Sequence, residues 1–369
     1  MKKVLYVATV DLHIRTFHLP YLKLLHDNGY EVHVATNGDE KFPYCDVKHQ
    51  ICIERSPFKV NNIKAIKQLR KIIDKEKFDI VHCHTPMGSV VARIASKNAR
   101  KNYGTRVIYT CHGFHFYKGA PLFNWIIFYP IEWYLSKYTD TLITINHEDE
   151  NLARKKFYKR CKNIVRIPGI GVDISKLKGK ISNVEKDKLR DKLNLSKKDF
   201  VIIYPARLCK DKNQKLLLDF MIINKNSNIK LLLPGRDEYN GFYQKYVKDN
   251  NIKNVCFLGH RTDIPDLLKI SNVLVAPSIR EGFGINLVEA LSCKLPVIAV
   301  DNRGHREIVK DGINGYIISN NVDELYRLLN MLYDNTNEYK KLVDNCYTTA
   351  SEFFLDKSIN AMKKIYNNN

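Results

Sequence analysis

The chain alternates short runs of β-branched and aliphatic residues with helical stretches of about ten to fifteen residues, in two successive series. Apolar strands joined by helices form βαβ units, which require a parallel sheet covered on both faces. Between the series, Ile167–Ser182 contains three glycines and lacks helical periodicity, as expected of a linker. The expected strands are Lys3–Ala8, Glu31–Ala35, Ile80–Cys83, Arg106–Thr110, Thr141–Ile145, Phe200–Tyr204, Ile229–Leu233, Val255–Leu258, Val273–Val275, Val297–Val300 and Gly315–Ile318.

The length of the chain agrees with two domains. Its 369 residues exceed what one hydrophobic core usually supports, and 44% of them are hydrophobic. In open parallel sheets, ligands bind beyond the carboxyl ends of the strands. The sequence therefore predicts an α/β enzyme of two Rossmann-like domains, with its site in the cleft between them. The tail is expected to be helical over Val322–Tyr333 and Glu338–Tyr366, with no proline to interrupt it.

Several classes of protein are disfavoured. No G-x-x-x-x-G-K-[ST] loop occurs, and Gly169-Ile170-Gly171 lacks the third glycine of a dinucleotide fingerprint, which argues against hydride transfer on a nicotinamide cofactor. Nine scattered cysteines, never spaced as Cys-x-x-Cys, indicate reduced thiols in the cytosol. The apolar runs Val4–Val10 and Ala120–Leu135 are too short or too interrupted for a signal peptide or a membrane span.

The segment Ser278–Ala290 has the form of a ligand-binding turn. It follows an expected buried strand (Val273–Ala276) and opens a helix that reaches about Cys293. Glu281 precedes the helix and Glu289 lies within it, so one carboxylate can face a reacting centre while the other accepts two hydrogen bonds from a ribose diol. The alternative is an ordinary strand-loop-helix with an acidic first turn. Free backbone N–H groups, suited to a phosphate or sugar hydroxyl, are expected at Gly284, Ile285, Asn286 and Leu287.

Two cations follow the first strand of the second half. Arg207 lies where that strand ends, and Lys212 lies at the expected start of the next helix. Together they can neutralise a diphosphate, which is the task that Mg²⁺ often performs. Solvated surface charge is the alternative, because the formal net charge of the chain is +21.

These segments, in this order, resemble the retaining family 4 glycosyltransferases of the GT-B fold, of the type that makes bacterial capsular polysaccharide or exopolysaccharide. The similarity is densest from residue 168 to about 318, and it includes Glu281 and Glu289 in EGFG…VEA. Further matching segments are Gly171–Asp173, Phe257–Gly259, Leu295–Ala299, Asp311–Gly315, Val81–Pro86, Thr110–His115, Thr139–Asp140 and Ile145–Asn146.

The resemblance implies an acceptor-binding Rossmann-like domain over residues 1–170 and a nucleotide-sugar donor-binding domain over residues 171–350. A C-terminal helix over residues 351–369 is expected to return to the first domain. The implied reaction moves a sugar, with retention, from UDP-hexose or UDP-N-acetylhexosamine to an undecaprenyl-diphosphate-linked glycan.

The resemblance also implies roles for individual residues. Arg207 and Lys212 are expected to bind the donor diphosphate, Glu289 the nucleotide ribose, and His112 to approach the donor sugar from the first domain. Glu281 is expected to hold hydroxyl groups of the donor sugar, together with the backbone of Phe283, Gly284, Ile285, Asn286 and Leu287.

The first loop departs from the family. Many members carry glycines where this chain has Thr9–Thr16, and His13 and Thr16 are our candidates there for contacts with the diphosphate or the acceptor.

Neither a metal nor a cofactor is expected. No Asp-x-Asp sequence occurs, so a metal-chelating signature of other glycosyltransferases is missing. A zinc site formed by His82-Cys83-His84, His112 and His115 is an alternative, but a strand points His82 and His84 to one face and Cys83 to the other. Histidines with satisfied hydrogen bonds at the sheet edge are the favoured interpretation.

The charge distribution points to a membrane surface. Residues 55–106 contain 13 Lys/Arg against three Asp/Glu, and residues 154–166 contain seven Lys/Arg and no acid. The helix expected over Ile63–Lys75 and the aromatic stretch Phe123–Tyr134 suit an anionic bilayer interface, although burial against the sheet is the alternative for both. We expect a cytoplasmic protein, peripheral on the inner face of the cytoplasmic membrane.

Two other functions remain as alternatives. A non-hydrolysing nucleotide-sugar epimerase shares the two-domain architecture but lacks the Arg207/Lys212 and Glu281/Glu289 arrangement. A nucleic-acid-binding protein fits the basic composition, but no recognised motif accompanies the charge, so we expect no nucleic-acid partner.

Overall fold

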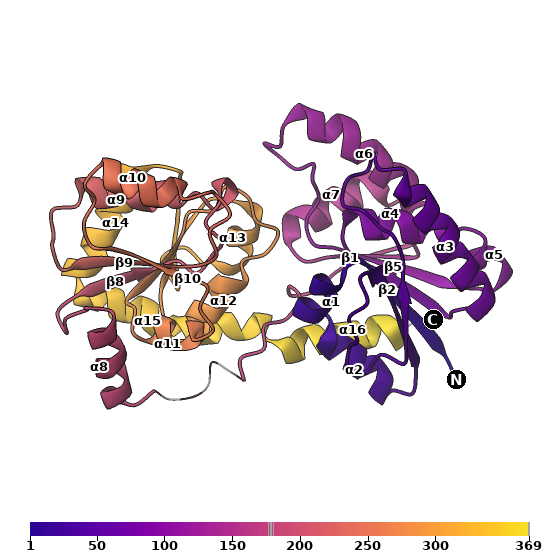
Figure 1. Ribbon diagram of the computed structural model, residues 1–369, viewed down its shortest axis with the longest axis horizontal. Helices are drawn as coiled ribbons and strands as arrows, with labels where there is room; N and C mark the ends of the chain where they lie inside the picture. Colours follow the sequence, from indigo (N-terminus) through magenta and orange to yellow (C-terminus); the bar gives the residue numbers. More distant parts are fainter. Residues whose placement is uncertain (176, 178, 180, 368–369) are drawn as a thin grey trace. The chain divides into compact units, whose positions relative to one another are not determined.

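The computed structural model describes residues 1–175, 177, 179 and 181–367, and it divides into two compact units (Figure 1). Unit 1 comprises Met1–Gly171 and Asp356–Asn369, and unit 2 comprises Val172–Leu355. These boundaries fall one and five residues beyond those expected from the sequence. Lys176, Lys178 and Lys180 of the expected linker, and the final two residues of the expected C-terminal helix, lie outside the described residues.

Unit 1 is built on a parallel seven-stranded sheet of order β3-β2-β1-β4-β5-β6-β7. The sequence predicted five of these strands but not the two at the sheet edges, which are partly exposed and therefore lack a continuous apolar run. The strands are β1 (Lys3–Val10), β2 (Glu31–Asn37), β3 (Val47–Gln50), β4 (Ile80–Cys83), β5 (Arg106–Cys111), β6 (Thr141–Thr144) and β7 (Asn163–Arg166).

Helices cover both faces of this sheet (Figure 1). One face carries α3 (Asn61–Glu76), α4 (Pro86–Ala95), α5 (Ala99–Asn102), α6 (Leu122–Ser136) and α7 (His147–Phe157), and the other carries α1 (Asp11–Phe17), α2 (Leu19–Asp27) and α16 (Leu355–Asn367).

The expectation of a loop over Thr9–Thr16 is wrong. Strand β1 extends to Val10, and helix α1 follows it directly. The hydroxyl of Thr16 donates to the carbonyl oxygen of Leu12 at 2.7 Å, a bond within the helix. No glycine-rich turn is needed here, because the chain passes from strand to helix without a left-handed residue.

The C-terminal segment is also not one helix. It breaks into α15 (Thr336–Ala350), η2 (Ser351–Phe353) and α16, with Phe354 in an extended conformation. The Val172 N–H donates to the carbonyl of Phe353, and the Leu355 N–H donates to the carbonyl of Val172, each at 3.0 Å. This pairing satisfies the backbone where the chain leaves unit 2. Helix α16 then returns to unit 1, as expected, where the Tyr366 hydroxyl lies 2.8 Å from His82 Nδ1.

Unit 2 contains a parallel six-stranded sheet of order β10-β9-β8-β11-β12-β13, and all six strands were predicted. They are β8 (Phe200–Ile203), β9 (Ile229–Pro234), β10 (Val255–Gly259), β11 (Val273–Ala276), β12 (Val297–Val300) and β13 (Gly315–Ile318). The helical elements are α8 (Asn183–Lys192), η1 (Lys210–Lys212), α9 (Gln214–Ile223), α10 (Phe242–Asp249), α11 (Ile264–Lys269), α12 (Ile285–Ser292), α13 (Arg303–Ile308) and α14 (Val322–Asp334), followed by α15.

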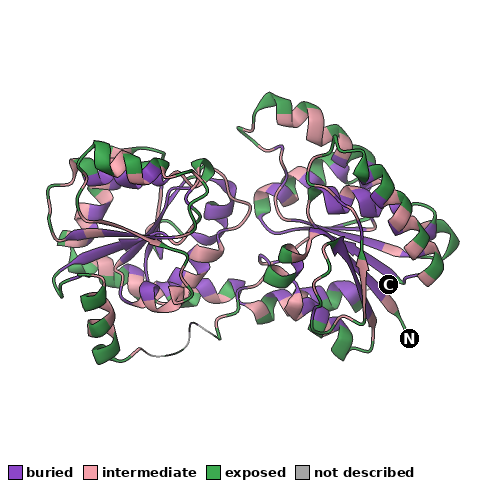
Figure 2. Ribbon diagram, in the orientation of Figure 1, coloured by how far each residue is buried: buried purple, intermediate pink, exposed green. Residues whose placement is uncertain are grey.

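Both sheets have a buried centre and a point where the strand order reverses (Figure 2). In unit 1 the reversal lies between β1 and β4, and in unit 2 it lies between β8 and β11. Open α/β sheets bind ligands beyond the carboxyl ends of the strands at such points. The fold therefore directs attention to the residues that follow these four strands.

Candidate active site

Lys212 and Glu281 form an ion pair at the reversal point of unit 2. Lys212 lies in η1, which follows β8, and Glu281 lies in the loop that follows β11. The Ile279 N–H donates to the carbonyl of Asp211 at 3.1 Å, so the backbones of the two segments are tied together. Both side chains are about four-fifths buried. The sequence had predicted each as a ligand contact, and the structure brings them together.

Gly304, at the start of α13, leaves the space that the Glu281 loop occupies. A Cβ atom at this position would lie 2.9 Å from both Cβ and the carbonyl oxygen of Glu281, and 2.9 Å from the Phe283 nitrogen. Sequence reasoning missed Gly304. A glycine inside a helical turn is unfavourable unless another segment needs the space, and this feature of the sequence could have indicated Gly304.

Helix α12 begins beside this loop with Gly284 as its N-cap. The Leu287 N–H donates to the carbonyl of Gly284 at 3.0 Å, so the expectation that it is free is wrong. The Leu287 N–H group is therefore used in a hydrogen bond within the first turn of the helix. The N–H groups of Ile285 and Asn286 precede it at the positive end of the helix, where an anion or a sugar hydroxyl is favoured.

Glu289 is a partly buried carboxyl group, and no cation pairs with it among the described residues. Burial raises its pKa to about 7. Hydrogen-bond donors from a ligand would satisfy its oxygens and favour the ionised form.

Arg207 forms an ion pair with a different residue, Glu238. Its Nη1 atom is 2.5 Å from Glu238 Oε2, and both side chains are largely exposed. Exposed ion pairs are weakly held, so Arg207 is free to exchange this partner for an anionic ligand.

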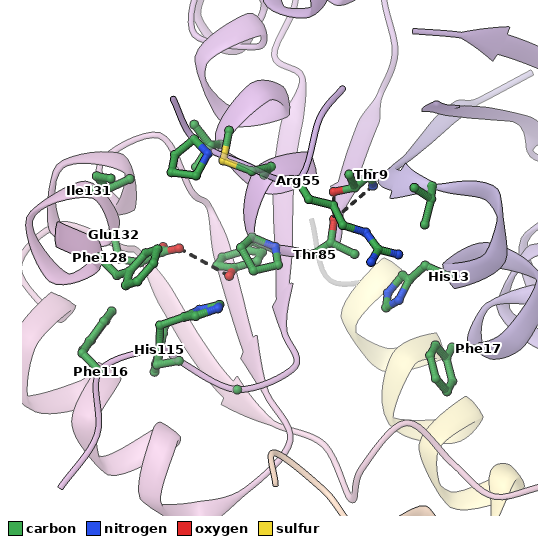
Figure 3. A pocket seen from close by; sticks show the side chains of 18 of the residues that line it. Thr9, His13, Phe17, Arg55, Thr85, His115, Phe116, Phe128, Ile131 and Glu132 are labelled. Carbon is green, nitrogen blue, oxygen red and sulfur yellow. Dashed lines mark hydrogen bonds between the residues drawn. The ribbon is translucent and has the colours of Figure 1, made fainter. Parts of the chain in front are cut away.

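Unit 1 has an apolar cavity of about 590 Å³ beyond the carboxyl ends of β1, β4 and β5 (Figure 3). Thr9, near the end of β1, and Thr85, which follows β4, are hydrogen-bonded to one another through their hydroxyls at 2.7 Å. The lining includes the predicted candidates His13 and Thr16. Arg55 also lines the cavity, and no carboxylate of the described residues pairs with it.

A buried ion pair supports one side of this cavity. Arg93 on α4 lies 2.8 Å from Glu132 on α6, and the Tyr109 hydroxyl donates to the other carboxylate oxygen at 3.4 Å. The Arg93 side chain is 1% exposed, and its guanidinium also donates to the backbone and hydroxyl of Ser89. The polar end of Glu132 is thereby held at the cavity wall.

His112 is not among the residues that line the cavity, and its Nε2 atom lies 3.5 Å from His84 Nδ1. The prediction that His82 and His84 share one face is confirmed, because their rings are 4.1 Å apart and Cys83 packs in the core on the other face. His82 has satisfied hydrogen bonds, as expected, to Tyr366 and to Thr110, each at 2.8 Å.

Two parallel-sheet units of these strand orders define the GT-B class of glycosyltransferases. Residues 185–349 match the family Glycosyl transferases group 1, and residues 3–146 match Glycosyl transferase 4-like. A Bacillus subtilis protein named "Putative glycosyltransferase EpsD" is 42% identical over 369 residues, covering 99% of this chain and 96% of that protein. The chain therefore belongs to the glycosyltransferase family that the sequence motifs resembled, and its activity is sugar transfer.

Two further comparisons agree. An Escherichia coli enzyme, UDP-Gal:alpha-D-GlcNAc-diphosphoundecaprenol alpha-1,3-galactosyltransferase, is 29% identical over 316 residues, covering 83% of this chain and 80% of that enzyme. The Anabaena protein HepE, solved with UDP and glucose, superposes with a TM-score of 0.77 at 20% identity, covering 99% of each chain. The latter likeness shows a shared fold.

The described residues include no helix that is both long and apolar enough to span a bilayer. All nine cysteines are free thiols.

Proposed function

We propose that this glycosyltransferase moves a hexose or N-acetylhexosamine, with retention, from a UDP-sugar to an undecaprenyl-diphosphate-linked glycan during synthesis of a capsular or other surface polysaccharide. The observation that carries the proposal is the Lys212–Glu281 pair at the reversal point of unit 2. The printed name of the E. coli relative, which specifies a UDP-sugar and a diphosphoundecaprenol acceptor, supports the substrate classes.

On the donor side, Lys212 and Arg207 bind the diphosphate and stabilise the charge that develops as it leaves. Glu281 and the N–H groups of Ile285 and Asn286 hold sugar hydroxyls, and Glu289 accepts hydrogen bonds from the ribose. Because Lys212 already pairs with Glu281, the carboxylate positions the ammonium group. The leaving phosphate oxygen takes the acceptor proton, and no metal ion is needed for the diphosphate.

On the acceptor side, the cavity of unit 1 offers an apolar wall for the first lipid units and the unpaired Arg55 for the diphosphate. His13 and Thr16 lie at the same cavity and contact the diphosphate or the acceptor glycan.

Exposed apolar side chains flank this cavity and suit peripheral attachment to an anionic membrane at the cytoplasmic leaflet. On α6, Leu122, Phe123 and Ile126 are 61–73% exposed, and Phe58 is 78% exposed next to the cavity residue Pro57. Helix α3, in contrast, buries Leu69 and Ile73 against the sheet and is an ordinary packed helix over most of its length. The membrane contact is therefore assigned to α6 and the segment before α3.

A release assay tests the function. Purified protein is incubated with a panel of UDP-, GDP- and ADP-sugars, with and without lipid-diphosphate-linked acceptors, in the presence and absence of EDTA. We expect UDP release that requires the acceptor, continues in EDTA and yields an α-linked product from an α-linked donor. Conversion of the donor to another nucleotide sugar without an acceptor would instead identify an epimerase.

A further inference from the structure

Four histidines from separate segments converge at the carboxyl edge of the unit 1 sheet. His13 lies in α1, His18 between α1 and α2, His84 after β4 and His112 after β5. One ring nitrogen of each lies within 4.8 Å of a ring nitrogen of the other three. The His18 and His84 rings are 3.9 Å apart, and those of His13 and His112 are 4.8 Å apart. Figure 3 shows His13 among the side chains that line the cavity.

Three of these side chains have an unsatisfied nitrogen. The Nε2 atoms of His13, His18 and His84 are buried and have no hydrogen-bond partner within the described part of the chain. His82, next to the cluster, uses both of its nitrogens. Because an unpaired buried polar group destabilises the fold, three in one cluster require an explanation.

Burial affects the pKa of all four imidazoles. Burial lowers the pKa of every one, to about 4 for His13 and well below the usual value for the others, and neighbouring histidines lower it further at His18, His84 and His112. The other titratable side chains that face the cluster are Tyr6, Tyr21 and His82, none of them a carboxylate that would stabilise an imidazolium.

We propose that His13, His18, His84 and His112 bind one divalent transition-metal ion of the zinc type through four imidazole nitrogens. Zinc prefers four nitrogen or sulfur ligands at about 2.0–2.3 Å, whereas Mg²⁺ and Ca²⁺ require oxygen ligands, which the cluster lacks. Small ring rotations toward a common centre would bring the four nitrogens into a tetrahedral arrangement. The site lies within unit 1 and is distinct from the donor diphosphate, for which no metal is proposed.

The sequence did not suggest this set of ligands. It offered His82, Cys83, His84, His112 and His115 as a zinc alternative and favoured satisfied histidines. The structure replaces His82, Cys83 and His115 with His13 and His18, because His82 is hydrogen-bonded, Cys83 faces the core, and the ring of His115 lies 4.6 Å from that of Phe128 at the cavity.

A buried water is the competing occupant. A second cavity of about 10 Å³, lined in part by Tyr6, His18, His82 and His84, is close to the minimum for one water molecule. A water can satisfy two or three of the nitrogens but binds no metal, so a metal titration separates the two.

The test uses untagged full-length protein, freed of metal with EDTA and desalted. Co²⁺ is added as a spectroscopic probe and then displaced with Zn²⁺. We expect one equivalent of Co²⁺ to give the intense visible bands of a tetrahedral complex, and one equivalent of Zn²⁺ to abolish them. His84→Gln and His18→Gln should weaken binding by more than the roughly 10- to 100-fold that loss of a supporting residue costs. His260→Gln, at an exposed histidine of unit 2, should bind as the wild type does.

The wild-type titration alone decides whether stoichiometric binding occurs, even if a buried variant fails to fold, and His13→Gln supplies a variant at a less buried ligand. Absence of tetrahedral Co²⁺ binding to the wild type would overturn the site in favour of water. Binding that is equal in wild type and His84→Gln would also overturn it. Since the readout is metal binding and not turnover, its failure leaves the proposed transferase function unaffected.

Discussion

Lys212 and Glu281, 69 residues apart in the chain, form an ion pair where the strand order of the unit 2 sheet reverses. The pair joins a cation suited to a diphosphate with a carboxylate suited to sugar hydroxyls. Its two members are held by different loops, and Gly304 provides the room for one of them.

Lys212→Ala and Glu281→Gln should each lower kcat/KM by about 100- to 1,000-fold, because each removes a charged group aimed at the transition state. Steady-state UDP release measures the effect, and thermal unfolding checks the fold. Lys215→Ala is the matched control, since Lys215 lies three residues away and pairs with Asp219 on the surface of α9. Turnover within a few-fold of wild type in the Lys212 variant would refute the assignment of the donor site.

Donor affinity should depend on pH through Glu289. Its pKa is raised to about 7, so it is mostly protonated at pH 6 and mostly ionised at pH 8. Since the proposed ribose contact requires the ionised form as hydrogen-bond acceptor, UDP-glucose should bind about tenfold more weakly at pH 6 than at pH 8. Calorimetry across this range measures the change, and Glu289→Gln should flatten the profile. An equally steep profile in that variant would assign the pH dependence to another group.

The same carboxyl group should affect stability in the opposite direction. Its pKa in the folded chain exceeds the ordinary value of 4.5, so between pH 4.5 and 7 the folded state keeps a proton that the unfolded state loses. The stability contributed by Glu289 is therefore complete below pH 4.5 and is lost as the pH rises to 7. Urea unfolding of wild type and Glu289→Gln should show this difference.

Glu132→Ala should destabilise unit 1 by about 3–5 kcal/mol, because it leaves Arg93 buried without its counter-ion. The double variant Arg93→Met, Glu132→Leu should recover most of this loss, since it removes both charges. Arg154→Ala breaks the exposed pair with Glu150 and should cost about 0.5 kcal/mol or less. Urea unfolding compares the three, and a double variant no more stable than Glu132→Ala would contradict the explanation.

Membrane attachment should depend on the exposed face of α6. Phe123→Ser with Ile126→Ser removes two apolar side chains that are 61–62% exposed, and the loss of their insertion should lower partition onto anionic vesicles about tenfold or more. Flotation at physiological salt measures partition. Val184→Ser, a similar change on α8 in unit 2, is the control. If wild type does not float with the vesicles, the proposal of peripheral attachment is wrong.

Much of the fold was predictable because central strands are buried on both faces and appear as continuous apolar runs. All six strands of unit 2 are examples. Strands β3 and β7 escaped detection because edge strands are partly exposed. The break at Phe354 also escaped detection, because its cause is the pairing with Val172, which is 182 residues earlier in the chain.

The sequence by itself determined the two-domain α/β architecture and the glycosyltransferase family, since periodicity and motif spacing are local properties. Only the tertiary structure decided which side chains meet. It paired Lys212 with Glu281, placed Arg55 at an apolar cavity and gathered four histidines whose burial lowers their pKa values. Such proximity depends on the order of strands in a sheet, and a pKa depends on burial by distant segments; neither is encoded in the spacing of neighbouring residues.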